Sequence, residues 1–150
     1  MRALAPRGLA WHGGPTPIRC LRGVDAELAR WRPPRGGHSI WELALHIAYW
    51  DHVVRGRLLG ARLPRFARRP ANWPRMPRRA DPAAWDADRL LVAEEHRRLL
   101  EVVQDFPAGK LARKLGTRKR WTYGDTILGI TVHDAYHAGQ IQLLKRIAPR

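Results

Sequence analysis

The chain has 150 residues, one cysteine and a formal net charge of +15, because 28 lysines and arginines stand against 13 acidic residues. The length predicts a single domain over residues 1–150, and the lone cysteine excludes an internal disulfide, as is typical of a reducing cytoplasm. No apolar run approaches the roughly 20 residues that cross a bilayer, and the first residues lack the apolar segment of a signal peptide. We therefore expect a cytoplasmic protein with no membrane partner.

The excess of basic residues has two interpretations. Basic side chains release counterions from nucleic-acid phosphates, so the charge favours a polyanion as partner. Most of these residues are arginine, however, and alanine, glycine and proline are abundant, which a GC-rich coding bias also produces. Composition alone leaves both interpretations open.

The first predicted element is an interrupted helix over residues 16–31. Thr16 is a suitable N-cap, and Pro17 occupies the first helical position, where its missing N–H costs nothing. Gly23 bends or breaks the helix. Cys20 has no second cysteine at ligand spacing, and we expect it to be a half-buried helix residue rather than a nucleophile.

A second helix is predicted over residues 40–59. Ser39 and Glu42 have the spacing of a capping box, and Gly60 is a suitable C-terminal stop. Its apolar stripe contains Ile40, Leu43, Ile47, Trp50 and Val54. At about 100° per residue His46 lies at the edge of that stripe, so we expect its imidazole to face the interior.

Residues 60–80 contain four prolines and seven arginines, which exclude a regular helix or a central strand. A loop of this length in a compact domain is often functional. Phe66, Trp73 and Met76 predict that part of it packs on the helices. Arginines interleaved with aromatic residues also fit a polyanion-binding segment, so the sequence leaves two interpretations of this crossover.

A third helix is predicted from Asp81 and Pro82, as N-cap and first residue, to about residue 104. His96 lies on its apolar face, either as a pocket or core residue or as a metal ligand. After a second basic connection over residues 110–120, Thr122 and Asp125 form the capping box of a last helix that ends near residue 147. Four helices with a long crossover between the second and third predict an all-α four-helix bundle.

The strongest functional pattern is the pair His133 and His137 in this last helix. Residues four apart share one helical face, so both imidazoles can contact one metal ion. His46 is the predicted third ligand, and three neutral imidazoles leave a coordination position for water or substrate, as in catalytic sites. Zinc and nickel both suit imidazole, and the sequence does not choose between them.

Three neighbours of the pair project near the same face. Asp134 is either an acceptor for an imidazole N–H, which would fix the tautomer of the histidine, or an ordinary polar residue where helices meet. Tyr136 and Gln140 are predicted only to border the pocket.

Residues 39–47 (SIWELALHI), residues 133–141 (HDAYHAGQI) and residues 11–13 (WHG) resemble the DinB/YfiT-like superfamily, named for damage-inducible protein B. The resemblance covers nearly the whole chain, and the second stretch is its most specific part. It implies an up-down-down-up four-helix bundle, often a homodimer, with a divalent metal bound by His46, His133 and His137. Characterised relatives include bacillithiol S-transferases and mycothiol-dependent maleylpyruvate isomerase, in which the metal activates a low-molecular-weight thiol.

Three functions remain open on these observations. The first is a metal-dependent thiol S-transferase or hydrolase that acts on a small electrophilic substrate. The second is a basic protein that binds nucleic acid or another polyanion on a helical scaffold. The third is a bundle that the metal stabilises without catalysis. The basic loops exceed those we associate with the family, which leaves the substrate or partner open.

Overall fold

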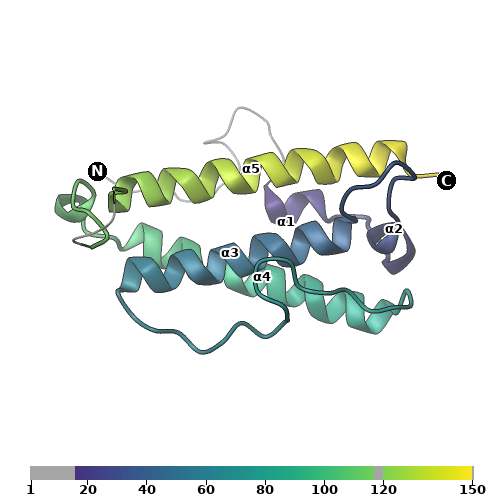
Figure 1. The fold of residues 1–150 in the computed structure, drawn as a ribbon, viewed down its shortest axis with the longest axis horizontal. Helices are drawn as coiled ribbons and strands as arrows, with labels where there is room; N and C mark the ends of the chain where they lie inside the picture. Colours follow the sequence, from purple (N-terminus) through teal and green to yellow (C-terminus); the bar gives the residue numbers. More distant parts are fainter. Residues whose placement is uncertain (1–15, 117–119, 150) are drawn as a thin grey trace.

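The computed structural model describes residues 16–116 and 120–149, and Figure 1 shows its helices. They are α1 (Pro17–Cys20), α2 (Ala26–Arg30), α3 (Ile40–Leu59), α4 (Pro82–Gln104), the short 3-10 helix η1 (Ala108–Lys110) and α5 (Tyr123–Ile147). Within these residues there is no strand beyond one isolated bridge between Lys114 and Thr122, so the all-α class is confirmed. None of the described helices is long and apolar enough to cross a membrane.

The long helices begin and end where their capping residues predict. Ser39 and Glu42 form the capping box of α3, and Gly60 ends this helix in the left-handed conformation, with φ 62°. Thr122 and Asp125 form the same box at the start of α5. Each box satisfies backbone N–H groups that have no partner inside the helix, which is why local sequence alone fixes these boundaries.

In place of one long first helix the structure has two short ones. Between α1 and α2 the chain turns through Gly23, whose φ of 72° is accessible to glycine at little cost. The predicted interruption is therefore confirmed, while the up-down-down-up arrangement stays a prediction. Cys20 lies in α1 and is fully buried, and burial raises the pKa of its thiol to about 12, so it is no nucleophile at neutral pH.

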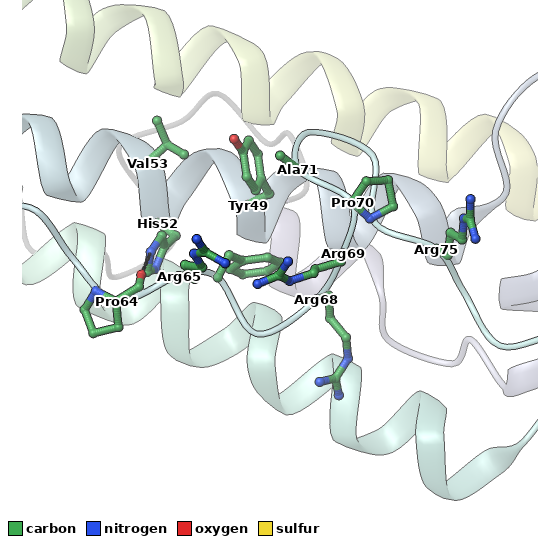
Figure 2. Close-up of a pocket in the computed structure, with 11 residues that line it drawn as sticks. Tyr49, His52, Val53, Pro64, Arg65, Arg68, Arg69, Pro70, Ala71 and Arg75 are labelled. Atoms are coloured by element: carbon green, nitrogen blue, oxygen red, sulfur yellow. Dashed lines mark hydrogen bonds between the residues drawn. The ribbon is translucent and has the colours of Figure 1, made fainter.

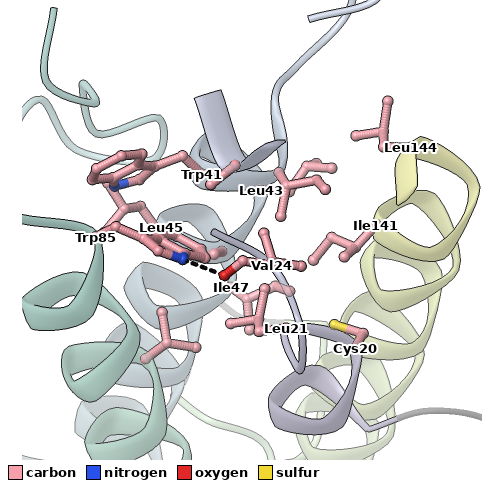
Figure 3. Packing of buried hydrophobic residues seen from close by; sticks show 14 of the residues in the cluster. Cys20, Leu21, Val24, Trp41, Leu43, Leu45, Ile47, Trp85, Ile141 and Leu144 are labelled. Carbon is pink, nitrogen blue, oxygen red and sulfur yellow. Dashed lines mark hydrogen bonds between the residues drawn. The ribbon is translucent and has the colours of Figure 1, made fainter. Parts of the chain in front are cut away.

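The core lies where α3 packs against α4 and α5 (Figures 1 and 3). Two buried indoles from α3 and α4, Trp41 and Trp85, pack with ring centroids 5.0 Å apart. The indole N–H of Trp41 donates to buried Asp88 at 2.8 Å, and that of Trp85 donates to the Val24 carbonyl, also at 2.8 Å. Both rings therefore bury a large apolar area without leaving a polar atom unsatisfied.

The crossover between α3 and α4 runs along the outside of these two helices (Figure 1). Phe66, Trp73 and Met76 are partly buried against the core, as the sequence predicts. The loop is thus anchored by apolar side chains at three points, while most of its arginines are exposed. Its anchored part lies beside His46, which makes it part of the candidate site.

Candidate metal centre

The three histidines predicted as ligands come together. His46 comes from α3, and His133 and His137 come from successive turns of α5. The Nε2 atoms of His46 and His133 are 3.1 Å apart, and one ligand nitrogen from each of the three rings lies within 4.8 Å of the others. Nitrogens bound to one tetrahedral metal at 2.0 to 2.1 Å lie about 3.4 Å apart, so this cluster could hold a metal ion with small side-chain adjustments.

The outer nitrogen of each ring already has an oxygen acceptor. Nδ1–H of His46 donates to the Asn72 carbonyl at 2.6 Å, and that of His137 donates to the side-chain oxygen of Gln140 at 2.6 Å. Nδ1–H of His133 donates to a carboxylate oxygen of Asp134 at 3.2 Å. This network assigns the proton of each neutral ring to Nδ1 and leaves the Nε2 lone pair for a cation.

Burial favours the uncharged form of two of these rings. His46 and His137 are only 6 % and 7 % exposed. Burial, together with the neighbouring rings of His137 and His133, lowers the pKa of His46 to about 4. Burial likewise lowers the pKa of His137. Neutral imidazole is the form that binds metals, so the donor set fits a divalent cation.

The crossover covers one face of His46. The Trp73 ring stacks on His46 at a centroid distance of 3.8 Å and on His38 at 3.6 Å, so the indole lies between two imidazoles. Asn72, whose carbonyl binds His46, has a positive φ of 68° and accepts a hydrogen bond from the Trp50 indole through its side chain. Asparagine tolerates this backbone conformation better than most residues, and the conformation aims the carbonyl at the imidazole.

A second cluster lies beside the first. Asp51 of α3, His96 of α4 and Asp134 of α5 bring one ligand atom each within 4.8 Å of the others. Nδ1–H of His96 donates to Asp51 at 3.0 Å and lies 3.8 Å from Asp134. His96 therefore belongs to a carboxylate–imidazole–carboxylate group and not to the three-histidine cluster. Because Asp134 also accepts from His133, this carboxylate joins the two groups.

The charges of the second cluster depend on burial and on each other. Asp51 is fully buried, and burial raises the pKa of its carboxyl to about 7. Burial lowers the pKa of His96, but the adjacent carboxylates outweigh this effect, so its pKa stays above the ordinary value. No described residue donates to the second oxygen of Asp51. A proton held on this cluster balances its negative charge.

Sequence reasoning missed several residues of the site. Asp51 lies at about 140° from His46 in helical projection, beside the apolar stripe, so the periodicity contained a signal for its burial. Gln140 is three residues after His137, the spacing of neighbours on one face, and it contacts the ring rather than only bordering the pocket. Asn72, Trp73 and His38 had no such signal as wall residues, because loop conformation and tertiary contact bring them there. The predicted Trp11-His12-Gly13 element lies outside the described residues.

Comparison with known proteins identifies the family of this chain. The family model described as the DinB superfamily matches residues 18–141, which is most of the chain and includes all three histidines. No curated protein and no solved structure matches the chain significantly. On the family match, the chain belongs to the DinB superfamily.

Proposed function

We propose that this protein is a divalent-metal-dependent enzyme in which His46, His133 and His137 hold the metal. The observation that carries the proposal is the orientation of the three rings. Each Nδ1–H has an oxygen acceptor, so Nε2 is the atom that each ring can offer to a metal, and the Nε2 atoms of His46 and His133 lie 3.1 Å apart. Three protein ligands leave a coordination position for water or substrate, which is the arrangement of catalytic rather than closed structural sites.

We infer that the reaction is thiol S-transfer or hydrolysis on a small electrophilic substrate. Zinc or nickel bound there would lower the pKa of a bound thiol or water, so that a nucleophile is available at neutral pH. Burial keeps the His46 and His137 rings neutral, and the acceptors at their Nδ1 atoms fix their tautomers. Trp73 excludes water from one face of His46. A low-molecular-weight thiol is the co-substrate that we infer for the transfer reaction.

The test begins with elemental analysis of untagged protein purified without added metal, beside His137→Ala. We expect about one zinc or nickel per chain in the parent and none in the variant, because two imidazoles and water bind far more weakly than three imidazoles. Retention of stoichiometric metal by the variant, or no metal in the parent even after reconstitution, would rule out the site.

Activity is then measured on the reconstituted protein. A thiol with 1-chloro-2,4-dinitrobenzene reports S-transfer, and a nitrophenyl ester reports hydrolysis. We expect turnover of one substrate class that chelator and His137→Ala both abolish. Metal binding that raises the melting temperature, with no turnover in a broad screen, would identify a metal-stabilised bundle instead.

A further inference from the structure

A groove lies between α3 and the crossover. Its volume is about 670 Å³, within the range of small-molecule sites. Figure 2 shows the lining residues Tyr49 and Val53 on α3 and Arg65, Arg69 and Pro70 on the loop that passes beside this helix. Nothing in the proposed metal chemistry accounts for this groove.

The inner surface of the groove is mainly apolar. Phe66 meets Tyr49 edge to face, with ring centroids 5.7 Å apart, and the His52 ring at 5.6 Å. Pro64 and Val53 extend the same surface. The His52 ring is held in its orientation by a hydrogen bond, because its Nε2–H donates to the Pro64 carbonyl at 2.9 Å. A flat apolar group is the ligand chemistry that such a surface fits.

The rim of the groove carries positive charge without matching negative charge. Four arginines line it, and only Arg68 has a partner, since its Nε donates to buried Asp88 at 2.7 Å. Across the described residues, no carboxylate lies at ion-pair distance from Arg65, Arg69 or Arg75. Three unpaired guanidinium groups around one groove favour an anion, which each can bind through forked hydrogen bonds.

Unpaired arginines are not confined to the groove. On α4, Arg97 pairs with Glu94 and Glu101, but among the described residues Arg19 of α1 and Arg146 of α5 have no carboxylate at ion-pair distance. What distinguishes the groove is that three unpaired guanidinium groups lie beside one apolar surface.

The groove and the metal centre share one stretch of loop. Pro70 and Ala71 line the groove, and the next residue, Asn72, places its carbonyl 2.6 Å from the His46 ring. We propose that the groove binds a small anion, a carboxylate or phosphate attached to a flat apolar body, beside the metal centre. That this anion is a substrate of the enzyme rests on the proposed function, whereas the anion site itself does not.

The test uses the full chain reconstituted with zinc and three probes of similar shape, 2-naphthoate, 2-naphthyl phosphate and neutral 2-naphthalenemethanol. Calorimetric titration at about 0.15 M salt keeps non-specific attraction low. We expect at least one anion to bind about tenfold more tightly than the neutral probe, and the two anions show which headgroup the groove prefers. Equal affinity for all three probes, or no binding, would overturn the proposal.

Two double variants locate the binding. Arg65→Gln with Arg69→Gln removes two rim charges, and we expect a loss of about tenfold in anion affinity. Arg78→Gln with Arg79→Gln is the matched control, since it removes the same charge from exposed positions of the same crossover that do not line the groove. We expect the control to stay within about twofold of the parent. Equal losses in both variants would overturn the groove as the site.

Two further measurements separate this proposal from its alternatives. His137→Ala is expected to bind the preferred anion as tightly as the parent does. A failure of metal binding can therefore be distinguished from a failure of anion binding in the groove. Titration with an oligothymidylate tests the alternative that these arginines bind a polyanion such as nucleic acid. Tight, salt-dependent binding that both double variants weaken equally, with naphthyl probes that do not compete, would assign the arginines to nucleic acid and overturn the small-molecule site.

Discussion

The two side-chain clusters have nearly the same scaffold and opposite electrostatics. Each takes one residue from α3 and one or two from α5, and His133 and Asp134 are adjacent in the chain. The first cluster contains three imidazoles, two of which, His46 and His137, are kept neutral by burial, and no acid among its three members. The second contains one imidazole between two carboxylates. The first cluster therefore offers nitrogen lone pairs to a metal cation, whereas bound protons offset the negative charge of the second cluster.

Asp134 makes the two clusters interdependent. One of its oxygens accepts from His133 and the other lies 3.8 Å from His96. Outer carboxylates of this kind orient a metal-binding imidazole and raise its basicity. We therefore interpret the second cluster as support for the first, with its own contribution to stability rather than to metal binding.

Replacing one histidine of each cluster should separate these roles most clearly. We expect His46→Ala to weaken zinc binding by about a thousandfold or more, because it removes one of three ligands. His96→Ala should keep zinc affinity within about tenfold, since it acts only through Asp134. It should lower the free energy of unfolding by about 3 kcal/mol, because Asp51 is left buried without its partner.

Competition with a chromogenic chelator gives the zinc affinities of these variants, and urea unfolding in the presence of a metal chelator gives their stabilities. Metal loss in His96→Ala equal to that in His46→Ala would show that the two clusters act as one site.

The second prediction concerns the pH dependence of stability in the metal-free protein. The pKa of Asp51 is raised to about 7 in the folded state, so the folded chain holds a proton that the unfolded chain releases as pH rises from about 4 to 7. The raised pKa of His96 acts in the same direction. Asp51 therefore contributes a fall in stability across this range, with a slope of up to about 1.4 kcal/mol per pH unit. The lowered pKa values of His46 and His137 oppose it, because these rings lose their protons on folding, so the contribution of Asp51 is measured as a difference between variants.

Asp51→Asn cannot titrate, so the slope of its stability against pH should be more positive than that of the parent over the same pH range. Urea unfolding at several pH values with chelator present measures both slopes, and Asp86→Asn, at an exposed position of α4, is the control that should retain the slope of the parent. Parallel curves for the parent and Asp51→Asn would place the titrating group elsewhere.

Sequence periodicity predicted the first cluster better than the second. The spacing of His133 and His137 and the position of His46 beside an apolar stripe depend only on helical geometry, which local sequence determines. The capping boxes of α3 and α5 likewise predicted where those helices begin, because capping depends on local sequence. Asp51 lies on an interior face too, but charged residues are seldom buried without a partner, and its partner His96 comes from another helix.

The crossover shows where prediction from sequence stops. Trp73 was expected to pack on the helices, and it does, but nothing local indicated that its ring would lie between His38 and His46. The carbonyl of Asn72 reaches His46 because the backbone adopts a positive φ. Such a conformation depends on tertiary contacts that the loop makes only once the helices have packed.

The third prediction tests the link between the clusters. Asp134→Asn keeps the size of the side chain but removes its charge, so we expect zinc affinity to fall about 10- to 100-fold while the metal stoichiometry is unchanged. Chelator competition measures the affinity. Asp86→Asn serves again as the control at an exposed carboxylate and should bind zinc as the parent does. An unchanged affinity in Asp134→Asn would mean that the second cluster does not influence the first.

The smallest effect is expected at the ligand that lacks a carboxylate. His137 donates to the neutral side-chain oxygen of Gln140, which is itself oriented by a 3.2 Å hydrogen bond from its amide to the Tyr136 hydroxyl. We expect Gln140→Leu to lower zinc affinity about tenfold, the lower end of the range for outer partners, because a neutral acceptor raises imidazole basicity less than a carboxylate does.

Gln142→Leu, at a half-buried position of the same helix, is the matched control for the change from amide to leucine. If both variants lose affinity equally, the effect comes from α5 as a whole. Gln140→Glu sharpens the comparison further, because it gives His137 the kind of acceptor that His133 already has. If charge on the outer partner is what distinguishes the two histidines, this variant should bind zinc more tightly than the parent, and an unchanged or weaker affinity would show that orientation alone matters.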